Sequence, residues 1–108
     1  MCIRDSAGAR LALVSQVSQT WFSLIETKLL LRSAEKNTDT FERASELTYR
    51  RFISGLSGSS DVRLARATRA SSEAIEILTQ QQVAALTRNL EILLGRYPAD
   101  EILSLIHI

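Results

Sequence analysis

The sequence has only one cysteine, one histidine and one methionine, and all three stand at its ends. Met1 and Cys2 open the chain and His107 is next to last, so residues 3–106 contain no thiol and no imidazole. Disulfide frameworks, cysteine–histidine metal sites and catalysis by cysteine or histidine are therefore excluded from this interior. A glycine-rich phosphate loop is also missing. We predict no catalytic residue, no cofactor and no metal site, and hence a protein that is not an enzyme.

Strong charge and long apolar runs are missing as well. The formal net charge is +1, which points neither to nucleic acid nor to a membrane surface as a partner. No apolar run is long enough to cross a bilayer as a helix. Alternating strand patterns bounded by turn residues are also lacking. Helices are therefore the only regular secondary structure that the sequence pattern favours.

The two ends are related in a way that unrelated protein termini rarely are. A DNA sequence that encodes residues 1–6 has a reverse complement that encodes residues 103–108, once the last codon is completed. Both segments look like the translated end of a transposon adapter used in sequencing libraries, so we exclude them from fold reasoning. We expect the native segment to be a fragment of a longer protein, with open ends on both sides.

Helix-breaking residues are few: the chain has four glycines and one proline. Apolar residues recur at steps of three and four, which is helical periodicity. We predict a first long helix over residues 7–54, a turn over residues 55–60, a second long helix over residues 61–95 and a linker over residues 96–102. The fold class is all-α, a long antiparallel two-helix coiled-coil hairpin.

The second predicted helix carries two seams, that is, two rows of residues that each run along one face of the helix. The first seam follows a strict three–four alternation through Val62, Ala65, Arg69, Ser72, Glu76, Thr79, Val83, Leu86, Leu90 and Leu93. The second seam runs through Leu64, Ala67, Ser71, Ala74, Leu78 and Ala85. Two seams on one helix indicate two partners, as in a bundle or barrel of helices. Arg69 and Glu76 on the first seam indicate either ion pairing between helices or a polar lumen, unless the seam is rotated by one position.

The predicted turn has specific local chemistry. Gly55 suits the left-handed position that ends a helix, and Leu56 can fold back onto the last helical turn. Ser59 or Ser60 can cap the next helix, where Asp61 meets the positive end of the helix dipole. A hairpin of this kind shares only one seam between its two helices. We therefore expect the isolated segment to be marginally stable or to aggregate.

The order of these features resembles the outer membrane factor family, the TolC-like exit ducts of bacterial efflux pumps and type I secretion systems. The family's hairpin tip is similar to R-[FY]-x-x-G-[VL]-x-x-x-x-D-V-x-x-A, and this chain matches it with Arg51, Phe52, Gly55, Leu56, Asp61, Val62 and Ala65. Residues 13–22 are similar to the family's helix entry. Residues 90–98 look like the L-x-x-L-L-G-x-x-P that closes the first of two internal repeats.

The resemblance implies a piece of a trimeric twelve-helix periplasmic α-barrel. The protomers would join an outer membrane β-barrel through strands outside this segment, which itself lies in the periplasm. It further implies a periplasmic adaptor protein as a direct partner and an inner membrane transporter as an indirect one. The residues expected at the tip turn, as a gate or adaptor docking site, are Arg51, Gly55, Leu56, Ser60, Asp61, Val62 and Arg63.

Other interpretations stay open. Asp61 is either a gate residue that binds cations or a neighbouring arginine, or only a first-turn acid that caps a helix. The arginines around the turn form either a salt-bridged, solvated tip or a docking surface. The whole segment is alternatively the coiled-coil hairpin of a periplasmic adaptor protein, or an unrelated coiled-coil scaffold. Lipoyl-like strands beside the hairpin would favour the adaptor, whereas β-barrel strands and a second similar hairpin would favour the duct.

Overall fold

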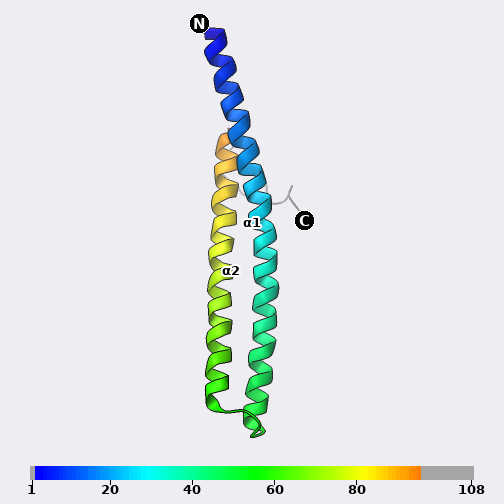
Figure 1. Cartoon of the computed structure of the whole chain (residues 1–108). Coiled ribbons are helices and arrows are strands. Elements are labelled where there is room, and N and C mark those ends of the chain that lie inside the picture. Colours follow the sequence, from blue (N-terminus) through cyan, green and yellow to red (C-terminus); the bar gives the residue numbers. More distant parts are fainter. Residues whose placement is uncertain (1, 96–108) are drawn as a thin grey trace. The chain divides into compact units, whose positions relative to one another are not determined.

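The computed structural model describes residues 2–95, and these residues form two helices, α1 (Cys2–Ile53) and α2 (Ser59–Leu93), with no strand among them (Figure 1). The all-α, two-helix fold expected from the sequence is confirmed. The linker predicted over residues 96–102 and the adapter segment over residues 103–108 lie outside the described residues.

The helix bounds follow the local chemistry of the chain. α1 contains no proline and a single glycine, Gly8, and Arg50 and Arg51 in its last turn complement the negative end of the helix dipole. The helix extends from the predicted segment back into residues 2–6. α2 begins at Ser59, two residues before the predicted bound. It ends at Leu93, and Gly95 follows with a φ of 73° that stops the helix.

The chain divides into two compact units, and each contains a part of both helices. Among the described residues, unit 1 comprises residues 2–28 and 81–95, and unit 2 comprises residues 29–80 with the turn. In unit 2, the helices run in opposite directions on either side of the turn (Figure 1).

Unit 1 buries large side chains. Leu24 and Leu90 are almost completely inaccessible, and Val83 is also buried. Thr87 is buried beside them in the sequence, and its Oγ1 donates a hydrogen bond to the Val83 carbonyl over 2.8 Å. Glu91 is also buried, at 1% exposed. Leucine burial is therefore the main stabilising contribution visible in this unit.

Unit 2 buries small and polar side chains. The buried residues here are Ala34, Ser45, Val62 and Ser72. Between the helices, the Thr38 and Ser72 hydroxyls share a hydrogen bond of 3.1 Å. The helices of this unit are therefore linked by specific polar contacts as well as by apolar burial.

The first seam predicted on α2 agrees with the observed burial. All ten of its residues are buried or half-buried, whereas every residue of the second seam is exposed. Arg69 donates from its guanidinium to Glu73 on its own helix at 2.9 Å and reaches Glu42 of α1 at 3.6 Å. Arg69 of the first seam is thus part of an ion pair between the helices. Because all ten seam residues are buried or half-buried, the seam is not rotated.

Candidate functional site: the turn between the helices

The turn after α1 is closed by two backbone hydrogen bonds around a left-handed glycine. Gly55 has a φ of 79°, the conformation that the sequence predicts for it. Its N–H donates to the Phe52 carbonyl at 3.0 Å, and the Leu56 N–H donates to the Arg51 carbonyl at 2.8 Å. This pair of bonds is the Schellman motif, which satisfies carbonyls that the end of a helix leaves open. The backbone of the turn is therefore fixed by its own sequence.

The Leu56 side chain does not pack against α1, although its backbone bonds to that helix. Its N–H folds back onto α1, but 78% of the residue remains exposed. The expected packing of Leu56 onto the last helical turn is therefore not observed. An exposed leucine at a turn offers apolar surface to a partner, although a single one is also common on monomers.

The start of α2 differs from the expected capping arrangement. The helix begins at Ser59, so Ser59 and Ser60 both lie inside its first turn, and Gly58 precedes them. Neither serine therefore stands before the helix, where an N-cap residue is placed. Asp61 does lie in the first turn, where a carboxylate interacts favourably with the helix dipole. Val62 is buried and anchors this turn of the helix.

The charges near the turn fall into two groups. Arg50 pairs with Glu46 on its own helix at 2.6 Å, and the Arg66 guanidinium lies 5.6 Å from the centre of the Tyr49 ring. Arg51, Arg63 and Asp61 are exposed, and none of them has an ion pair within residues 2–95.

The expected site residues are therefore of three kinds. Gly55 shapes the backbone, Val62 is buried, and the other expected residues form an exposed surface with free charges of both signs: Arg51, Leu56, Ser60, Asp61 and Arg63. Free guanidinium and carboxylate groups beside an exposed leucine are suited to binding a partner through charge-assisted hydrogen bonds.

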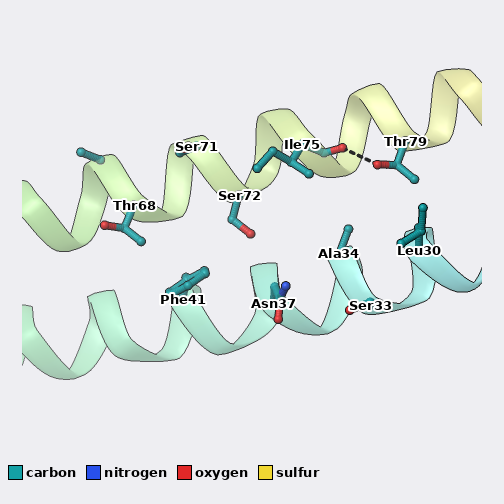
Figure 2. A pocket seen from close by; sticks show the side chains of 11 residues that line it. Leu30, Ser33, Ala34, Asn37, Phe41, Thr68, Ser71, Ser72, Ile75 and Thr79 are labelled. Carbon is teal, nitrogen blue, oxygen red and sulfur yellow. Dashed lines mark hydrogen bonds between the residues drawn. The ribbon is translucent and has the colours of Figure 1, made fainter.

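Sequence reasoning did not identify a second surface, a groove in unit 2 whose α2 side includes residues of both predicted seams. We name it the hairpin groove: eleven residues line it, between Leu30 and Phe41 on α1 and between Ala67 and Thr79 on α2, and this open groove has a volume of about 660 Å³. Figure 2 shows side chains of both helices, among them Ala34 and Ser72, pointing into the space between the ribbons. The signal that could have revealed it was the regular spacing of uncharged residues on both helices.

Other kinds of site are not found in the described part of the chain. No group of three or more histidine, cysteine, aspartate or glutamate residues comes together there in a way that could hold a metal ion. Neither α1 nor α2 has a stretch apolar enough to cross a bilayer within those residues.

No protein-family model, curated protein or solved structure matches this chain.

Proposed function

We propose that this chain is a segment of the wall of an outer membrane factor, the periplasmic conduit of a tripartite efflux pump or type I secretion system. In this proposal the segment lies in the periplasm, the complete protein forms a homotrimer in the outer membrane, and a periplasmic adaptor protein docks at the turn. An inner membrane transporter would supply the energy, because the segment contributes a passive wall.

The observation that carries the proposal is the pair of seams on α2. The first seam is buried or half-buried along its whole length, while the second is uncovered, with Leu64 at 68% and Leu78 at 58% exposed. An apolar stripe parallel to a buried one needs another helix to cover it. A ring of helices gives every helix two neighbours and so accounts for both seams.

The turn supports the family assignment more specifically than the seams do. Gly55, at the glycine position of the family pattern, has the left-handed backbone that such a position needs. Arg51, Asp61 and Arg63 flank it with charges that are not paired within residues 2–95, as a gate or docking tip requires. A hairpin whose exposed tip includes Leu56 is also compatible with an adaptor protein, which is the alternative function.

The test uses the complete protein that contains this segment, reconstituted in a planar lipid bilayer. We expect an ion-conducting channel, and we expect Asp61→Ala to raise its conductance because a carboxylate at the constricted tip is removed. Asp39→Ala is the matched control, since Asp39 is an exposed acid that pairs with Arg43 on its own helix at 3.1 Å. Its conductance should equal that of the wild type.

Three results would count against parts of this proposal. A complete protein that forms no channel, or that carries lipoyl-like strands beside the hairpin, would replace the conduit with the adaptor. Unchanged conductance in Asp61→Ala would leave Asp61 as a helix-terminal acid only. An equal rise in Asp39→Ala would make the effect one of total charge rather than of the tip.

A further inference from the structure

We draw no further inference here: the strongest candidate, the open hairpin groove between α1 and α2 in unit 2, is an unpartnered face of the hairpin, and nothing in the structure shows what covers it.

Discussion

In unit 1 the buried side chains include Leu24, Val83 and Leu90, while in unit 2 the largest buried apolar side chain is that of Val62. Unit 1 therefore gains most from removing leucine surface from water, at about 25 cal/mol for each Å² of apolar area. Unit 2 has fewer apolar groups to bury but adds a hydroxyl pair, an ion pair between helices and a closed turn. One pair of helices can therefore obtain most of its burial energy in one region, here unit 1. The directional contacts that fix how the helices pair lie in another region, here unit 2.

The largest effect that would test this comparison is expected for Leu24→Ala in unit 1. Removing a fully buried leucine side chain should lower the free energy of unfolding by about 2–5 kcal/mol, because both burial and packing are lost. Thermal unfolding followed by circular dichroism measures the change. Leu11→Ala is the control, since Leu11 is 72% exposed and should change stability by less than about 0.5 kcal/mol. Similar effects of the two variants would contradict the assignment of a leucine core to unit 1.

An intermediate effect is expected for Gly55→Ala in unit 2. A residue with a side chain costs about 1–2 kcal/mol in the left-handed conformation that Gly55 adopts at a φ of 79°. Gly58→Ala is the matched control in the same turn, because an added Cβ there would meet only the Ser60 Oγ, at 3.7 Å. Hydrogen exchange should show the loss of protection in amides of residues 45–70 for Gly55→Ala alone. Equal loss in both variants would mean that the turn does not depend on the Gly55 conformation.

The smallest effect is expected for the hydroxyl pair between Thr38 and Ser72. A double-mutant cycle with Thr38→Val and Ser72→Ala should give a coupling energy of about 0.5–1 kcal/mol, the net contribution of one neutral hydrogen bond. Denaturant unfolding of the four proteins measures it. The same cycle with Thr40→Val in place of Thr38→Val should give no coupling, because Thr40 is exposed and bonds only its own helix. A coupling of zero for Thr38 would remove the hydroxyl pair from the forces that fix the pairing in unit 2.

The fold and the first seam of α2 were predictable from the sequence because one periodicity persists through the whole helix. Ten positions follow it without interruption, and neither Arg69 nor Glu76 breaks it. α1 was harder, because it carries apolar residues on several faces: Leu13, Val14 and Leu47 belong to its apolar pattern but are exposed. The residues of α1 that face inward in unit 2 include Thr38 and Ser45, which hydrophobic patterning does not detect.

The turn was predictable in its backbone and not in its side chains. Gly55 is specified by a local rule, since few other residues adopt a left-handed conformation without strain. The exposure of Leu56 and the position of Ser60 inside α2 depend on how the chain re-enters the helix, which no single residue determines. The hairpin groove requires two distant segments to be aligned, so its volume follows only from the three-dimensional arrangement.

Hydroxyl groups along both helices bond the backbone four residues earlier. Their donors are Thr27, Thr38, Thr40, Thr48, Ser54, Thr68, Thr79 and Thr87. The Thr38 hydroxyl donates its one hydrogen to the Ala34 carbonyl at 3.0 Å, so it is the acceptor in the pair with Ser72. If the two helices of unit 2 separated there, water would need to replace only the contact between the two hydroxyls. Opening the contact would therefore transfer one hydrogen bond of the Ser72 hydroxyl to water, while the Thr38 hydroxyl would still be bonded within its own helix.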